Sequence, residues 1–101
     1  DINPERYGQS VDQHTKNEEA TPEGKARAEY EFALLKGAIE AKLPTMGVCG
    51  GMQRINVLLG GDLYQHVPDV VGHESHNQQR DGLAPFIPVQ LVQLVPRSTL
   101  A

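Results

Sequence analysis

Cys49 is the only cysteine of this 101-residue chain, and glycines lie on both sides of it, at positions 47, 50 and 51. Glycine adopts tight backbone conformations that bulkier residues resist, so this spacing predicts a sharp turn with the thiol at its tip. A helix that begins at the turn would direct its first N–H groups at the sulfur and stabilise the thiolate. Because the thiolate is the form that attacks a carbonyl carbon, Cys49 is the candidate nucleophile.

The backbone N–H of Gly50, directly after Cys49, is the candidate donor to the oxyanion of a tetrahedral intermediate. Two other interpretations stay open from the residues alone: Cys49 is a small apolar residue at the end of a core strand, or the glycines hold a phosphate. The second is disfavoured, because G-x-x-G-G matches neither the dinucleotide-binding pattern nor the P-loop. Acyl transfer also needs a base and an orienting carboxylate, which the pattern does not identify.

A strand and a helix must position this turn, and the apolar pattern predicts both. Thr21 and Pro22 are typical of a helix start, and two apolar stripes predict a helix over residues 22–42 that needs cover on both sides. The polar stretches 1–21 and 62–88 are predicted loops. The other predicted elements are a strand at 44–48, the turn at 49–51, a helix at 51–60 and a last strand at 89–95.

The composition excludes several classes of protein. Nine Lys and Arg residues against thirteen Asp and Glu give a formal charge of −4, the wrong sign for a protein that binds a nucleic-acid backbone. No apolar stretch is long enough for a membrane helix, the N-terminus lacks the features of a signal peptide, and a single cysteine cannot form an internal disulfide. These observations predict a soluble, cytoplasmic protein without a nucleic-acid or membrane partner.

Four histidines are candidates for the missing base, and three of them, His66, His73 and His76, for a metal site; the fourth is His14. The segment from His73 to His76 is one residue short of the H-E-x-x-H pattern of zinc-binding helices, and it lies in a predicted polar loop. Solvated loop histidines are therefore the preferred interpretation, and the sequence predicts no metal site.

Residues 43–65, LPTMGVCGGMQRINVLLGGDLYQ, resemble the nucleophile segment of class I glutamine amidotransferases. The resemblance is closest to the γ-glutamyl-γ-aminobutyrate hydrolase branch, which is peptidase C26-like. Residues 1–8, the pair Arg27 and Glu31, and His73 agree with the family in the same order along the chain. The resemblance implies a flavodoxin-like α/β fold, a three-layer sandwich around a mostly parallel sheet.

By the same resemblance, the reaction is hydrolysis of a γ-glutamyl amide bond through a thioester on Cys49, with Gly50 as an oxyanion donor. Gln53 is the candidate substrate-binding residue, the substrate is a small γ-glutamyl molecule, and no cofactor or metal is implied. Two positions depart from the family pattern: Gly50 stands where an arginine is common, and Ala28 stands where an aspartate usually follows Arg27. The missing charges would orient the substrate or brace the turn.

The resemblance also implies parts that this sequence does not contain. The family's base histidine and its carboxylate partner lie in a later His-Pro-Glu segment, and its first strands precede the position of Asp1. Residues 1–101 are therefore expected to be the central portion of such a domain, inactive alone and completed by another chain or a homo-oligomer. A catalytically silent fragment or pseudoenzyme that serves in binding or assembly is the main alternative, and a redox protein that oxidises Cys49 is a third.

Overall fold

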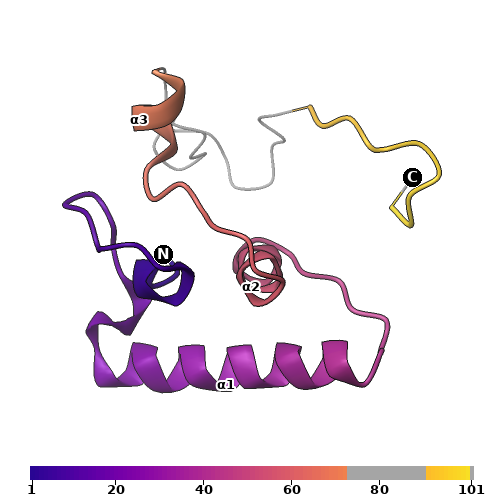
Figure 1. The fold of residues 1–101 in the computed structure, drawn as a ribbon, viewed down its shortest axis with the longest axis horizontal. Helices are drawn as coiled ribbons and strands as arrows, with labels where there is room; N and C mark the ends of the chain where they lie inside the picture. The colour runs from indigo at the N-terminus through magenta and orange to yellow at the C-terminus, as the bar shows by residue number, and fades with distance from the viewer. Residues whose placement is uncertain (73–90, 101) are drawn as a thin grey trace, which may run out of the picture.

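The computed structural model of the protein describes residues 1–72 and 91–100, with the backbone alone at Val71. Within these residues, the regular elements are all helical (Figure 1): two 3-10 helices, η1 and η2, and three α-helices, α1 to α3. They span Pro4–Tyr7 (η1), Glu18–Ala20 (η2), Pro22–Glu40 (α1), Gly50–Leu58 (α2) and Val67–Val71 (α3). No helix of the described part is both long and apolar enough to cross a membrane.

The long helix α1 begins where the sequence predicts a helix start. The Oγ1 of Thr21 accepts a hydrogen bond of 3.1 Å from a backbone N–H of the first turn, and Pro22 takes a position where no N–H is needed. The helix ends at Glu40, two residues before the predicted end. It ends there because Lys42 adopts a left-handed backbone conformation, with a φ of +56°, that turns the chain away from the helix axis.

A small core forms where the N-terminal segment meets α1. The buried side chains there are Ile2, Pro4, Ala28 and Phe32. The guanidinium of Arg6 lies 4.3 Å from the centre of the Phe32 ring, and Arg6 donates two hydrogen bonds, of 2.6 and 3.0 Å, to the Glu19 carboxylate. The guanidinium over the Phe32 ring therefore joins η1 to α1. The ion pair between Arg6 and Glu19 joins η1 to η2.

The ion pair between Arg6 and Glu19 determines how stability should respond to acid. Hydrogen bonding by Arg6 holds the pKa of Glu19 below its usual value of 4.5. A group with a lowered pKa stabilises the fold above its unfolded-state pKa, and this stabilisation is lost as the pH falls through the lowered value. In urea unfolding we expect Glu19→Gln to cost about 1–2 kcal/mol at neutral pH and to weaken the further loss of stability on acidification.

Glu29→Gln, a change of an exposed carboxylate on α1, is the matched control and should alter the free energy of unfolding by less than about 0.5 kcal/mol. Some acid dependence will remain in Glu19→Gln, because hydrogen bonds also lower the pKa values of Asp12 and Glu31. If Glu19→Gln lost stability on acidification as steeply as the unmodified chain, the ion pair would not be the cause.

Helix α2 crosses α1 and packs against it, so that Figure 1 shows α2 end-on above α1. It spans Gly50–Leu58, where residues 51–60 are the predicted helix. Gly60, with a φ of +89°, turns the chain after the last helical residues, and the Asn56 side chain donates a 2.8 Å hydrogen bond to the Asp62 carbonyl. The glycines at 60 and 61 thus follow the end of the helix as the sequence predicts, and the last helical residue is two positions earlier than predicted.

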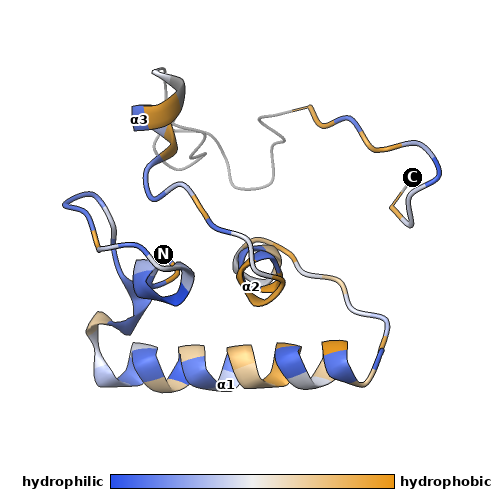
Figure 2. Cartoon of the chain, viewed as in Figure 1, coloured by the Kyte–Doolittle hydropathy of each residue, from blue (hydrophilic) through white to orange (hydrophobic). Residues whose placement is uncertain are grey.

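Apolar side chains remain exposed on both long helices. Figure 2 shows apolar residues on α2 and toward the end of α1. The more exposed ones on these helices are Tyr30, Leu34 and Met52. The sequence predicts that other parts of the protein pack against both sides of α1. Within residues 1–72 and 91–100, they pack against only one side.

The two predicted strands do not form in the described part of the chain. Residues 44–48 are irregular, and Met46 and Val48 are 72% and 71% exposed, which corrects the prediction of a buried strand there. Residues 91–95 are irregular as well, while 89–90 of the last predicted strand lie outside the described residues. A strand forms only where a neighbouring strand pairs with its N–H and C=O groups, and no described segment provides one.

Short helices lie inside both predicted loops. The structure has η1 and η2 within residues 1–21, and α3 within the described part of 62–88. Pro68 lies in the first turn of α3, and Gly72, with a φ of +69°, ends the helix. Helices of three to five residues are too short to show an apolar period, so the pattern does not predict them.

Candidate functional site

Cys49 lies at a strained turn directly before α2. Its backbone has a φ of +53° and a ψ of −115°, a region that residues with a side chain seldom adopt. Such a conformation costs about 1–3 kcal/mol, persists where the surrounding structure imposes it, and is concentrated at functional sites. The side chain of Cys49 is exposed, which does not fit its interpretation as a small core residue.

Close approach of two backbone segments at Gly47 imposes the turn. A Cβ atom on Gly47 would lie 2.6 Å from backbone atoms of both Gly51 and Met52. The N–H of Gly51 donates a 2.9 Å hydrogen bond to the Val48 carbonyl and closes the turn. Among the backbone hydrogen bonds of the described residues, none uses the N–H of Gly50.

The contact at Gly47 allows a matched pair of substitutions. We expect Gly47→Ala to lower the free energy of unfolding by about 1–3 kcal/mol, because the new Cβ overlaps backbone atoms that cannot rotate away. The distorted turn should also change the rate at which Cys49 reacts with a disulfide reagent.

Gly51→Ala is the control, because its added Cβ meets nothing within 4 Å. It should leave the thiol reactivity unchanged and stabilise the chain by up to about 1 kcal/mol, since alanine favours a helix over glycine. Equal effects of the two substitutions would mean that the approach at Gly47 does not shape the turn.

Cys49 opens into a cleft of about 450 Å³ between α1 and the start of α2, a volume typical of small-molecule sites. Both charged and apolar side chains line it. From α1 come Arg27, Glu31, Leu34 and Leu35, and from the turn and α2 come Val48, Cys49, Gly50, Gly51 and Arg54. Cys49 and Gly50 therefore border a space that can hold a small polar molecule.

Four side chains of alternating charge form a network, and three of them, Arg27, Glu31 and Arg54, line this cleft. The guanidinium of Arg54, which is 6% exposed, lies 2.5 Å from Glu18 and 2.9 Å from Glu31. Arg27 donates a further 2.9 Å hydrogen bond to Glu31. This bond, together with the charge of Arg54, lowers the pKa of Glu31, so the carboxylate is ionised at neutral pH. The charges hold η2, α1 and α2 together around the Cys49 turn.

The other predicted site residues lie elsewhere. Gln53 lines a second cavity, of about 60 Å³, with Ile2, Tyr7 and other residues, and it does not line the Cys49 cleft. Of the histidines, His14 and His66 are described, and neither borders the cleft. His73 and His76 lie outside the described residues. Cys49 and Gly50 thus line one cleft, whereas Gln53 lines another cavity, although its N–H donates a 3.2 Å hydrogen bond to the Cys49 carbonyl.

Comparison with known proteins identifies the family to which this chain belongs. The model of the family described as Peptidase C26 matches residues 1–101. This chain belongs to the peptidase C26 family. The resemblance to class I glutamine amidotransferases is thereby confirmed. Membership of the C26 family implies a flavodoxin-like α/β fold, of which the described residues contain helices but no strand.

Curated relatives of this C26 chain carry names of one kind. "Putative glutamine amidotransferase Rv2859c" of Mycobacterium tuberculosis is 43% identical over 76 residues, and "Putative glutamine amidotransferase-like protein RP404" of Rickettsia prowazekii is 39% identical over 75. "Putative glutamine amidotransferase-like protein YvdE" of Lactococcus lactis is 35% identical over 78. These alignments cover 75%, 74% and 77% of the chain, but only 23%, 25% and 31% of the relatives. No solved structure matches the chain significantly.

By the family resemblance, an arginine is common at the position of Gly50, and in this structure the side chain of Arg54 lies beside that position. A Cβ atom on Gly50 would lie 2.7 Å from Nη1 of Arg54, so a guanidinium lies beside this position although it comes from one helical turn later. Ala28, which stands where an aspartate is usual, is fully buried. The carboxylates next to the guanidinium come instead from Glu18 and Glu31.

Neither Arg54 nor Glu18 is among the site residues that the sequence pattern predicts. The spacing of four residues between Gly50 and Arg54, which puts both on one face of a helix, is the signal that could have indicated Arg54. Glu18 is 36 residues from Arg54 and carries no local signal of the contact.

Proposed function

We propose that this chain is part of a cysteine hydrolase that cleaves the γ-glutamyl amide bond of a small molecule through a thioester on Cys49. The observation that carries the proposal is the exposed thiol on a strained turn at a cleft, next to Gly50, whose N–H makes no backbone hydrogen bond within the described residues. Family membership and the names of the relatives support the substrate class, since glutamine is itself a γ-glutamyl amide.

The chemistry follows from these two groups. The thiolate of Cys49 attacks the γ-carbonyl carbon, and the C=O electron pair moves onto the oxygen, which accepts a hydrogen bond from the N–H of Gly50. The base has taken the proton of the thiol and gives it to the nitrogen when this intermediate collapses, so that the C–N bond breaks and the amine leaves. Water then attacks the thioester and gives a proton to the base, the C–S bond breaks, and the thiolate is released with the acid, which ionises to glutamate.

The base and its carboxylate partner are proposed to come from outside this chain, in line with the described histidines, which do not border the Cys49 cleft. They would be supplied by further residues of the same protein, by a complementing chain or by a second copy in a homo-oligomer. The predicted substrate contact of Gln53 would then be indirect, through its place on α2, because its side chain lines another cavity. A cytoplasmic location stays a prediction.

Labelling tests the proposal directly. Intact protein that contains this chain is incubated with a glutamine-shaped diazo ketone, and the product is mapped by peptide mass spectrometry. We expect a single adduct on Cys49 and slower labelling when a γ-glutamyl amide competes. Iodoacetamide, which needs an exposed thiol but no γ-glutamyl recognition, serves as the control.

The alternative proposal is a catalytically silent element that serves in binding or assembly. The exposed apolar side chains on α1, α2 and the segment before Cys49 favour it, because such surface is normally covered. The same experiment separates the two proposals. Alkylation of Cys49 by iodoacetamide without any diazo-ketone adduct in folded protein would support the silent element and contradict the hydrolase.

A further inference from the structure

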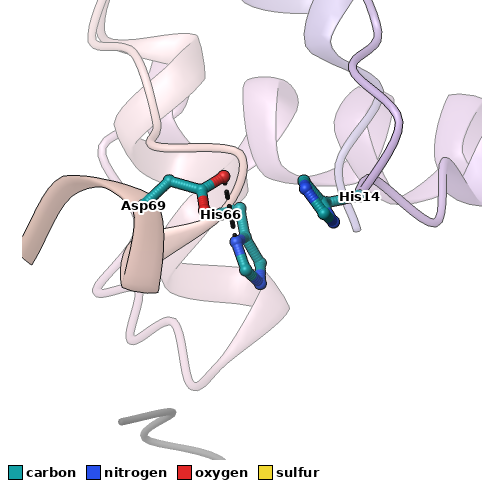
Figure 3. Close-up of side chains that lie close together, drawn as sticks. All are labelled: His14, His66 and Asp69. Atoms are coloured by element: carbon teal, nitrogen blue, oxygen red, sulfur yellow. Dashed lines mark ion pairs between the residues drawn. The ribbon is translucent and has the colours of Figure 1, made fainter. Parts of the chain in front are cut away.

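Two histidines and an aspartate meet at a place that does not border the Cys49 cleft. His14, from the loop between η1 and η2, stacks on His66 with ring centres 4.6 Å apart and ring planes 18° from parallel. The Nδ1 of His66 lies 3.1 Å from the Oδ2 of Asp69, in α3. Figure 3 shows the three side chains together, and one ligand atom from each lies within 4.8 Å of the others.

Hydrogen bonds from Gln65, the residue next to His66, hold the two segments in this position. The side-chain carboxamide of Gln65 bonds to the loop that carries His14 through both its oxygen and its nitrogen. The oxygen accepts from the Asp12 N–H at 2.9 Å and from Thr15 Oγ1 at 2.8 Å, and the nitrogen donates to Gln9 Oε1 at 3.1 Å and to the Ser10 carbonyl at 2.8 Å. The cluster is therefore positioned by contacts that do not involve its own members.

One ring nitrogen of the cluster is shielded from water and lacks a hydrogen-bond partner. This nitrogen is Nδ1 of His66, whose neighbour, the Asp69 carboxylate, is close enough for an ion pair but not aligned for a hydrogen bond. A shielded nitrogen without a partner costs free energy. A cation placed between this nitrogen and the carboxylate would remove that cost.

We infer that His14, His66 and Asp69 form a binding site for a divalent transition-metal ion of the zinc type. Imidazole nitrogen and carboxylate oxygen are ligands that Zn²⁺ prefers, and three protein ligands with water in the fourth position are a common arrangement. Ligand bonds of about 2.0–2.1 Å place the ligand atoms about 3.3 Å apart, so the separations within the cluster, now up to 4.8 Å, must shorten.

Contraction requires one movement. An ion cannot lie in the planes of two stacked rings at once, so the His14 ring must turn out of the stack. His14 and Asp69 are exposed and can change rotamer, whereas His66 is half-buried and already faces the carboxylate. The bound ion would then join the His14 loop to the start of α3 and stabilise the folded state in proportion to its concentration.

Calorimetric titration with Zn²⁺ tests the site in intact protein that contains this chain and carries no histidine tag. The Cys49→Ser background is used, so that the thiol does not bind the metal. We expect one ion per chain, and affinity at least about tenfold weaker in His14→Gln, His66→Gln and Asp69→Asn. Asp62→Asn, which changes an exposed carboxylate outside the cluster, should leave the affinity unchanged.

Unchanged affinity in the double variant His14→Gln/His66→Gln, or absence of binding in the parent chain, would overturn the inference. Imidazole NMR of the parent chain provides a measurement that needs no folded variant: Zn²⁺ should shift the resonances of both His14 and His66. Shifts confined to other histidines would also contradict the site. None of these measurements depends on hydrolase activity, so the inference can fail or succeed independently of the proposed function.

Discussion

Replacing Arg54 by methionine is expected to lower the free energy of unfolding by about 3–5 kcal/mol in urea denaturation. The guanidinium is buried between the carboxylates of Glu18 and Glu31, and its loss leaves both without their buried cation. Glu18 is affected most, because its Oε1 is already shielded without a hydrogen-bond partner. The substitution also removes the cation that lies 5.7 Å from the centre of the Phe32 ring.

Arg27→Met provides the matched control for Arg54. Arg27 contacts the same carboxylate, Glu31, but its side chain is 77% exposed, so its loss should cost less than about 1 kcal/mol. The triple variant Arg54→Met/Glu18→Gln/Glu31→Gln should recover part of the stability, because it leaves no uncompensated buried charge. Equal costs for the two arginines would show that the buried network does not support the turn.

The second large effect is expected in catalysis. In intact protein that contains this chain, Cys49→Ala should lower kcat for hydrolysis of a γ-glutamyl amide by at least about a thousandfold, because no thioester can form. Release of glutamate measures the rate. The substrate should still bind, since the methyl group is smaller than the thiol and the cleft is otherwise intact.

Lys36→Ala, an exposed change on α1 away from the cleft, is the control and should retain the rate. Circular dichroism should show the same helix content in both variants. Hydrolysis at the unmodified rate in Cys49→Ala would remove Cys49 from the mechanism and, with it, the proposed function of this turn.

The chain's local signals predicted its long helices well. Thr21 and Pro22 mark the start of α1, and the glycines at 60 and 61 mark the end of α2, because capping and helix termination depend on a few adjacent residues. A short apolar run after Pro44 predicts a strand at 44–48, and the structure has none there. Whether an apolar run becomes a strand depends on a pairing partner, which local sequence does not reveal.

The sequence likewise predicts one part of the candidate site and not the other. A lone cysteine among glycines was enough to predict a turn with a thiol at its tip, and the structure has Cys49 exposed at a strained turn. Gln53 and Arg54 are neighbours in sequence, yet Gln53 lines a separate cavity while Arg54 borders the Cys49 cleft. Successive residues on a helix point about 100° apart, so only the packing of α2 on α1 decides which one faces the site.

The amino-acid sequence by itself determined the nucleophile candidate, the approximate positions of the main helices and the family resemblance, because each rests on the order of residues within short segments. Only the tertiary structure decided that Glu18, Glu31 and Arg54 share one buried contact, and that His14 meets His66. These pairs are separated by 23 to 52 residues, and a contact at such a distance depends on how whole elements pack rather than on any local preference.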